Sequence, residues 1–238
     1  MHITRLQFLR SAWIVILLVS VTVLFDLFRI YIRPGMIKNK ILNSVQWKSM
    51  RRKLSKELEV QPEVILAGTS LTYSLNINYF HSKRVFNLGI PGELTDGLIK
   101  RIPDIIKIKP KKVFIEIGIN DILAGNDVLK VYSNIRIIVD ELRRELPDVV
   151  IYIQGLFPTY LENGWFTQNN TINSRIIQLN RYLKHLCSQK RLNYINTHSL
   201  FMKQGQPVPE YFSDGVHLTD SAYIKWEQML QPYIMEEL

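Results

Sequence analysis

The feature that most constrains the fold of this chain is a repeated alternation of short apolar segments with longer segments of helical periodicity. The short segments lack a regular polar alternation, which is typical of strands buried on both faces of a parallel sheet. Helices then cover both faces. The expected strands are Val64–Ala67, Val85–Leu88, Val113–Ile117, Val149–Gln154 and Asn193–Ile195; the expected helices are Asp96–Lys107, Val128–Glu145, Ile172–Gln189 and Asp220–Ile234, the last with Thr219 as its N-cap. The sequence therefore predicts an α/β three-layer sandwich with a flavodoxin-like, five-stranded parallel sheet.

Small and polar residues follow the first three expected strands. Ser70 comes shortly after the first strand, Gly89 directly after the second, and Asn120 shortly after the third. The carboxyl ends of parallel strands meet at one edge of a sheet, where such folds bind their ligands. We therefore expect Ser70, Gly89 and Asn120 to lie at the same edge.

A histidine and an acid near the end of the chain complete a candidate nucleophilic site. Asp214 precedes His217 by three residues, so in one short loop its carboxylate can reach the near ring nitrogen and leave the far nitrogen for Ser70. A serine hydroxyl is a weak nucleophile until an imidazole accepts its proton, and a carboxylate orients that imidazole. Each residue also has an ordinary interpretation: Ser70 as a helix cap, Asp214 as a turn residue and Asn120 as either.

These segments, taken in order, resemble the SGNH (GDSL-like) hydrolase family over roughly residues 62–235. The positions that match its four blocks and its acid are Ser70, Gly89, Asn120, Asp214 and His217. One departure is Thr69, because the eponymous motif has an aspartate directly before the nucleophile. The change bears on subfamily and substrate more than on the chemistry.

The resemblance implies acyl transfer without a cofactor or metal. Ser70 would attack an ester carbonyl with His217 as the base, and the oxyanion would accept hydrogen bonds from the N–H groups of Ser70 and Gly89 and from the Asn120 amide. Members of the family include carbohydrate O-acetyl esterases, lysophospholipases, thioesterases and acyltransferases. We expect a serine esterase that removes acyl groups, for example acetyl groups, from a glycan or lipid ester of the cell envelope. An O-acyltransferase of envelope polysaccharide and a non-catalytic binding protein of the same fold are the alternatives.

Aromatic residues gather in the segment after the fourth expected strand. They are Phe157, Tyr160, Trp165 and Phe166. The segment is expected near the site's edge, so these rings are candidates for substrate binding, and ordinary packing of a long loop explains them equally well.

The positive charge of the chain is confined to its beginning. The formal net charge is +9, yet residues 1–60 hold 11 basic and 3 acidic residues, which leaves 19 basic and 18 acidic residues in the remainder. The catalytic region is therefore almost neutral and offers no basic groove for nucleic acid.

The first 33 residues have the pattern of a membrane anchor. The run Ser11–Phe25 is apolar apart from Ser20 and Thr22, and a helix extended over Leu6–Phe28 reaches a spanning length. A cleaved signal peptide and a buried core helix are the competing interpretations. Residues 34–61 then form a basic amphipathic segment that suits either an anionic membrane surface or packing on the domain. The expected organisation is an anchor over 1–33, a linker over 34–61 and a hydrolase-like domain over 62–238.

Two features of the sequence predict opposite orientations for the anchor. Basic residues after the span outnumber those before it, which by the positive-inside tendency favours a cytoplasmic domain. A short basic N-terminus before an apolar run instead resembles a signal anchor that exports the C-terminal part of the chain. We expect the domain to be extracytoplasmic.

Overall fold

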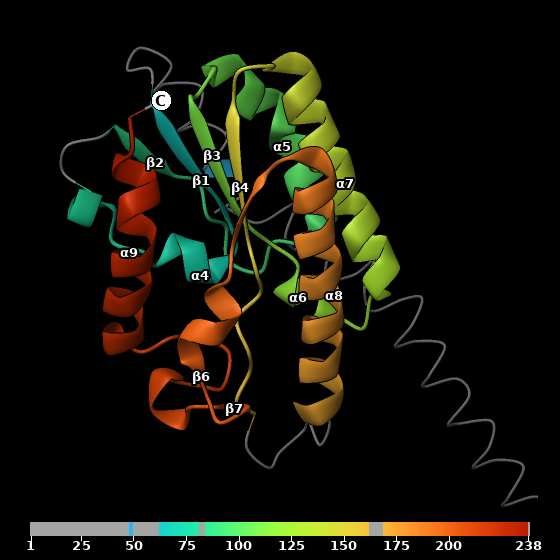
Figure 1. Ribbon diagram of the computed structural model, residues 1–238, viewed down its shortest axis with the longest axis vertical. Coiled ribbons are helices and arrows are strands. Elements are labelled where there is room, and N and C mark those ends of the chain that lie inside the picture. Colours follow the sequence, from blue (N-terminus) through green and yellow to red (C-terminus); the bar gives the residue numbers. More distant parts are fainter. Residues whose placement is uncertain (1–47, 50–61, 81–83, 162–168, 238) are drawn as a thin grey trace, which may run out of the picture.

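A five-stranded parallel sheet forms the centre of the protein (Figure 1). The computed structural model describes residues 48–49, 62–80, 84–161 and 169–237. The strand order is β2-β1-β3-β4-β5. The strands are β1 (Val64–Gly68), β2 (Val85–Asn87), β3 (Lys112–Glu116), β4 (Val150–Gln154) and β5 (Asn193–Ile195). Each falls on an expected segment, so the predicted parallel sheet is confirmed.

Helices cover both faces of this sheet. Figure 1 shows α9 on one side and α5, α7 and α8 on the other. The helices are α4 (Ser70–Tyr73), α5 (Thr95–Ile108), α6 (Ile119–Leu123), α7 (Val128–Glu145), α8 (Asn169–Lys190) and α9 (Asp220–Met235). The bounds of α7 are those expected, and Thr219 is the N-cap of α9, although its side chain makes no capping hydrogen bond. Helices as short as α4 and α6 leave no periodic pattern, and the sequence did not predict them.

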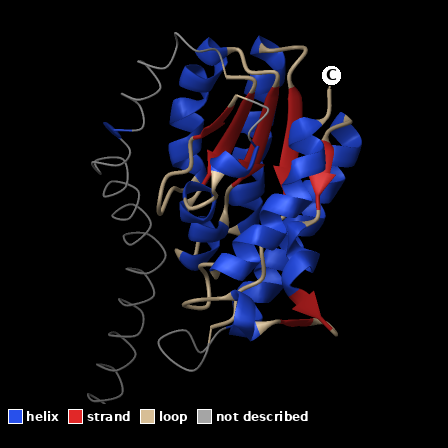
Figure 2. Ribbon diagram, turned by 90° about the vertical axis from the view of Figure 1, so that its left-hand side faces the viewer, coloured by secondary structure: helices blue, strands red, loops and turns tan. Residues whose placement is uncertain are grey.

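The chain between β5 and α9 makes a separate small structure. It contains the 3₁₀ helices η4 (Thr197–Phe201) and η5 (Pro209–Tyr211), with a hairpin of β6 (Met202–Lys203) and β7 (Gln206–Pro207) between them. Figure 2 shows this hairpin apart from the main sheet. An isolated antiparallel bridge between Phe212 and Leu218 then closes the loop that carries the predicted Asp214 and His217.

Aromatic packing joins α9 to the sheet. Trp226 of α9 is buried, and its indole N–H donates to Gln154 Oε1 at 2.8 Å. The rings of Phe114 and Tyr152 on β3 and β4 stack with 4.3 Å between their centroids, and Tyr233 of α9 packs edge-on against Tyr152. These contacts fix α9 against one face of the sheet, and thereby the loop immediately before it.

The expected membrane anchor lies outside the described residues, as does nearly all of the basic segment 34–61. Among the residues that the structure describes, none of the helices has the length and apolar character required to cross a membrane.

Two glycines allow backbone segments to approach closely at the carboxyl ends of β1 and β2. A Cβ atom on Gly68 would lie 2.5 Å from the carbonyl oxygen of Glu116. A Cβ atom on Gly89 would lie 2.2 Å from the backbone nitrogen of Tyr73. Both distances are shorter than real Cβ contacts, so these positions accept only glycine without movement of the backbone.

We predict that Gly89→Ala destabilises the protein by at least about 2 kcal/mol, within the range for overpacking, because the atom it meets belongs to backbone. Gly97→Ala is the matched control. The nearest atom to its Cβ is the Cγ of the Glu93 side chain, at 3.1 Å. Alanine also favours the helix by about 1 kcal/mol. Urea unfolding of both variants measures the difference, and an equally small loss in both would contradict the close approach at Gly89.

Candidate active site

The nucleophile candidate begins a helix directly after β1. Thr69 is the N-cap of α4, and its Oγ1 accepts a hydrogen bond from the Leu71 N–H at 3.3 Å. Ser70 is the first residue of this helix, so its own N–H has no partner within the helix. The strand-to-helix turn therefore places Ser70 at the carboxyl edge of the sheet, as the sequence predicted.

The structure brings Ser70, His217 and Asp214 together in one chain of hydrogen bonds. Ser70 Oγ lies 2.9 Å from His217 Nε2, and His217 Nδ1 lies 2.6 Å from Asp214 Oδ2. An imidazole that donates from Nδ1 to the carboxylate keeps Nε2 as an acceptor for the serine hydroxyl. The geometry is that of a nucleophile, a base and an orienting acid.

The Asp214 carboxylate is fixed by its own loop. Its Oδ1 accepts hydrogen bonds from the N–H groups of Val216 at 3.0 Å and His217 at 2.8 Å. Partial burial acts to raise the pKa of Asp214, but these bonds and the His217 ring together lower it below its ordinary value. The acid is therefore ionised at neutral pH and suited to stabilise an imidazolium. The side chains of His217 and Asp214 remain 46% and 56% exposed.

A neighbouring segment supports the loop that carries His217. The N–H of Tyr160 donates to the Gly215 carbonyl at 2.8 Å. Gly215 has φ 88°, and a Cβ there would lie 2.3 Å from the Tyr160 carbonyl oxygen. Glycine is required at this position for two reasons: the positive φ angle, and the close approach of the Tyr160 backbone.

Asn120 lies at the start of α6, beside the loop after β2. Its Nδ2 donates to the Glu93 carbonyl at 3.0 Å, which leaves the second N–H of the amide for another acceptor. The N–H of Ile90 donates to the Gly68 carbonyl at 2.9 Å, so the same loop lies against the turn that holds Ser70. The turn of Ser70, the loop after β2 and the start of α6 therefore lie together at one edge of the sheet, as expected.

Gly89 does not offer the free N–H that the resemblance implied. Its N–H donates to Asn87 Oδ1 at 2.9 Å, while Asn87 Nδ2 donates to the Thr72 carbonyl at 2.6 Å. Together with the close approach to Tyr73, these bonds make Gly89 a packing position.

Gly92, in the same loop, was not singled out from the sequence. It has φ 76° and comes after Pro91 in a turn in which the Glu93 N–H donates to the Ile90 carbonyl at 3.1 Å. Among the described residues its N–H has no hydrogen-bond partner. The Pro-Gly pair, a type II turn signal, was the available clue.

One of the candidate aromatic residues lies in the core. Phe157 is only 3% exposed, and its ring packs on those of Phe201 and Trp226. It therefore belongs to the core, which corrects its expected substrate contact. Tyr160 is half-buried and packs against the core, while Trp165 and Phe166 lie outside the described residues.

Two buried carboxyl groups near the site were not singled out from the sequence either. Glu116 Oε2 accepts from the hydroxyls of Thr69 at 2.9 Å and Thr72 at 3.0 Å, and Asp121 accepts from the N–H and hydroxyl of Thr95 at 2.9 Å each. Burial raises the pKa of Glu116 to about 7 and that of Asp121 to about 6, because the hydrogen bonds only partly offset the loss of solvation.

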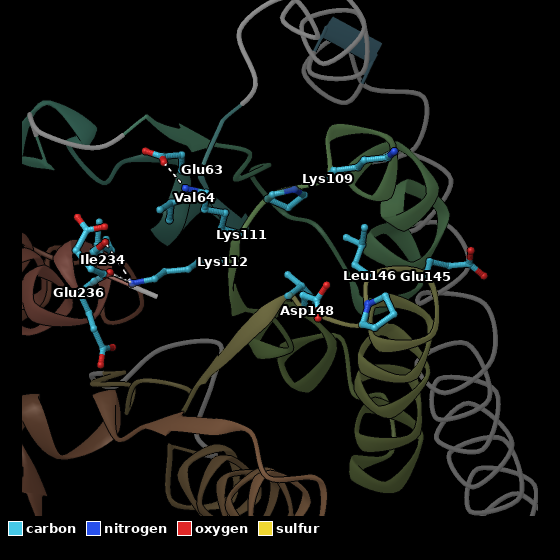
Figure 3. A pocket seen from close by; sticks show the side chains of 14 residues that line it. Glu63, Val64, Lys109, Lys111, Lys112, Glu145, Leu146, Asp148, Ile234 and Glu236 are labelled. Carbon is cyan, nitrogen blue, oxygen red and sulfur yellow. Dashed lines mark hydrogen bonds and ion pairs between the residues drawn. The ribbon is translucent and has the colours of Figure 1, made fainter.

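A cavity of about 580 Å³ lies at the opposite edge of the sheet, against the amino ends of β1, β3 and β4 (Figure 3). Lys112 lines this cavity, and its Nζ donates to the carbonyl oxygens of Tyr233 and Glu236. Lys111, also in the lining, forms an ion pair with Glu63 at 2.9 Å. Ser70 follows the carboxyl end of β1, whereas this cavity lies against the amino ends of the strands. The length of the strands therefore separates the cavity from Ser70.

The fold is that of an α/β protein with a parallel sheet, and at one edge of this sheet a serine, a histidine and an aspartate are joined by hydrogen bonds. The profile of the GDSL-like Lipase/Acylhydrolase family matches residues 68–224, more than half of the chain, and the chain belongs to that family.

Solved structures share the fold at low sequence identity. A GDSL-like lipase from Bacteroides thetaiotaomicron has a TM-score of 0.69 and 19% identity, over 79% of this chain and 98% of that one. An acetylxylan esterase from Geobacillus stearothermophilus has a TM-score of 0.61 and 19% identity, over 74% of this chain and 95% of that one.

The curated relatives are longer proteins. N-acylneuraminate cytidylyltransferase of Streptococcus agalactiae is 22% identical over 173 residues, which are 72% of this chain and 38% of that protein. This chain therefore spans well under half the length of the curated relatives that it matches.

We predict that Glu116→Gln stabilises the protein relative to the wild type as pH rises. The folded pKa of about 7 is above the ordinary value of 4.5, so the native state holds this proton more tightly than the unfolded chain. Wild-type stability is therefore lost as pH rises from about 4.5 through 7, whereas glutamine does not titrate. Urea unfolding from pH 5 to 8 should show a difference that grows and then levels above pH 7. A constant difference across that interval would contradict the raised pKa.

Proposed function

We propose that the protein is a serine esterase in which Ser70 is the nucleophile, His217 the general base and Asp214 the orienting acid. The Ser70 Oγ to His217 Nε2 distance of 2.9 Å carries this proposal, because it lets the imidazole take the hydroxyl proton as Ser70 attacks the ester carbonyl. The imidazolium then gives the proton to the leaving alcohol, and a water activated by His217 hydrolyses the acyl-serine.

The oxyanion would accept hydrogen bonds from the Ser70 N–H, the Asn120 side-chain amide and the Gly92 N–H. Gly92 replaces Gly89 in this set, because the Gly89 N–H is engaged by Asn87. The Asn120 bond to the Glu93 carbonyl holds α6 against the loop of Gly92 before substrate arrives, and donors that are fixed in advance are the condition for effective charge stabilisation.

The proposed substrate is an O-acylated carbohydrate, with acetyl as the acyl group. Two comparisons support this choice: a neighbour in fold is an acetylxylan esterase, and the curated relative is named for N-acylneuraminate. The half-exposed His217 and Asp214 leave the site open to a bulky sugar on the alcohol side. Initial rates on p-nitrophenyl acetate, longer acyl esters and acetylated oligosaccharides test it, and a preference for long acyl chains would overturn it in favour of lipid esters.

We predict that Ser70→Ala and His217→Ala each lower kcat for p-nitrophenyl acetate by about 10⁴-fold or more, and that the double variant is hardly worse. Groups that act as one unit give such non-additive losses. Asp214→Asn should lose less but still severely. Steady-state kinetics measure all four variants, with circular dichroism as the control for folding. Retention of a tenth of the wild-type rate by His217→Ala would remove it as the base.

We predict that Asn120→Ala lowers kcat and kcat/KM in parallel, by about 10²- to 10³-fold, and leaves KM nearly unchanged. The amide acts when charge develops on the oxyanion, not when substrate binds. Thermal unfolding of the same preparation is the control. A turn or cap residue would instead lose about 1 kcal/mol of stability with near-normal turnover.

We further propose that residues 1–33 anchor the protein in a membrane and place the hydrolase domain on the extracytoplasmic side. The apolar run and its flanking arginines support the anchor. Protease treatment of intact cells tests the orientation: loss of the domain supports it, and protection until the membrane is breached overturns it.

A further inference from the structure

A buried carboxyl group lies directly behind the turn that carries Ser70. Glu116 is the last residue of β3, is 0% exposed, and pairs in register with Gly68 of β1. Its Oε2 accepts from the hydroxyls of Thr69 at 2.9 Å and Thr72 at 3.0 Å, and the Thr69 N–H is 3.4 Å away. The two threonines come immediately before Ser70 and two residues after it, so one oxygen atom holds both sides of the nucleophile.

This carboxyl group is an unfavourable feature for a core position. Its other oxygen, Oε1, is buried and has no hydrogen-bond partner, and no ion pair to Glu116 occurs among the described residues. An apolar side chain would fill the same space without the loss of solvation. The position of Glu116 is therefore better explained by what it does to the turn than by what it adds to stability.

The contacts form a continuous line from β3 to the nucleophile. Thr69 Oγ1 donates to Glu116 and accepts from the Leu71 N–H, so the carboxyl group fixes the direction of the capping hydroxyl. The absence of a side chain on Gly68 lets this turn lie directly on β3, since a Cβ there would be 2.1 Å from Thr72 Oγ1. A shift of Thr69 would shift Ser70, the next residue, relative to His217.

We propose that Glu116 is a positioning residue for Ser70: by accepting the hydroxyl hydrogens of Thr69 and Thr72, it holds Ser70 Oγ within reach of His217 Nε2. Thr69 stands where the family's eponymous motif has an aspartate, so in this chain the carboxyl group at the turn comes from the neighbouring strand. The proposal rests on Ser70 being the nucleophile of the proposed esterase.

Covalent labelling tests the proposal without knowledge of the substrate. A fluorophosphonate probe reports the reactivity of Ser70, and p-nitrophenyl acetate reports kcat and KM. The variants are Glu116→Ala, which removes the acceptor; Glu116→Gln, which keeps one; and Thr69→Val, which removes a donor at nearly constant shape. Ile138→Ala is the matched control, because Ile138 is fully buried in α7, away from the turn, and its truncation loosens the fold without touching Ser70.

We expect Glu116→Ala to lower the labelling rate and kcat by about 10²-fold, the effect of a misplaced reactive group, with KM nearly unchanged. Glu116→Gln should recover most of the rate. Thr69→Val should lower the labelling rate of the wild type. In the Glu116→Ala background the same substitution should lower the rate by much less, because Thr69 and Glu116 form one contact. The Ile138→Ala control should label at the wild-type rate.

Labelling of Glu116→Ala at the wild-type rate, failure of glutamine to recover activity, or an equal loss in Ile138→Ala would each overturn the positioning role. If Glu116→Ala does not fold, a wild-type rate in Thr69→Val overturns it instead. A wild-type protein that is labelled but hydrolyses no ester overturns the esterase proposal alone, and the labelling series still decides the role of Glu116. A wild-type protein that is not labelled overturns both.

Discussion

The geometry of the site depends on the close contact of three chain segments at Gly68. The backbone of Gly68 pairs with Glu116 on one side, and its carbonyl accepts the Ile90 N–H at 2.9 Å on the other. The turn to Ser70, the end of β3 and the loop after β2 are therefore tied together by backbone groups before any side chain is considered. Because a Cβ on Gly68 would meet both Thr72 and the Glu116 carbonyl, this arrangement requires glycine.

The loop after β2 is held by a fully buried ion pair. Arg101 Nε and one of its terminal nitrogens donate to Glu93 at 2.8 and 2.5 Å, and the same terminal nitrogen donates to the Leu88 carbonyl at 2.8 Å. Both side chains are 0% exposed, and removal of one partner of such a pair leaves an uncompensated charge. Arg101 thus joins the two ends of the loop that contains Gly92, while Asn120 bonds to the Glu93 carbonyl in the same loop. The loop after β2 is thus stabilised by an ion pair, whereas the turn of Ser70 is stabilised by the carboxyl group of Glu116.

The sequence was sufficient to predict the sheet and the polar residues that follow its strands. Buried parallel strands have a strong apolar signal, and α7 was predicted with its observed bounds because eighteen residues carry several periods of amphipathic pattern. Ser70, Asn120 and His217 could be proposed as site residues because residue type and order along the chain carry the information. The free N–H expected at Gly89 was wrong, and the choice between substrate binding and packing at Phe157 was left open, for a different reason. Whether an N–H is free, or a ring is in the core, depends on contacts between distant segments that no local pattern encodes. The pairing of Glu116 with Thr69, 47 residues apart, was hidden for the same reason.

The difference in exposure within the site is a consequence of how its parts are supported. Ser70 and Asn120 come from turns at strand ends that lie against the core, whereas Asp214 and His217 belong to a loop that is about half exposed and is braced by the Tyr160 N–H and by the bridge between Phe212 and Leu218. The proposed nucleophile and oxyanion donors are thus held by the core, which suits charge stabilisation that must exist before reaction. His217, the proposed base, lies on the solvent side, where water would reach the proposed acyl-serine for the second half of hydrolysis. Support by the core for Ser70 and Asn120, and access to solvent for Asp214 and His217, both follow from the position of the latter two residues in a loop outside the sheet.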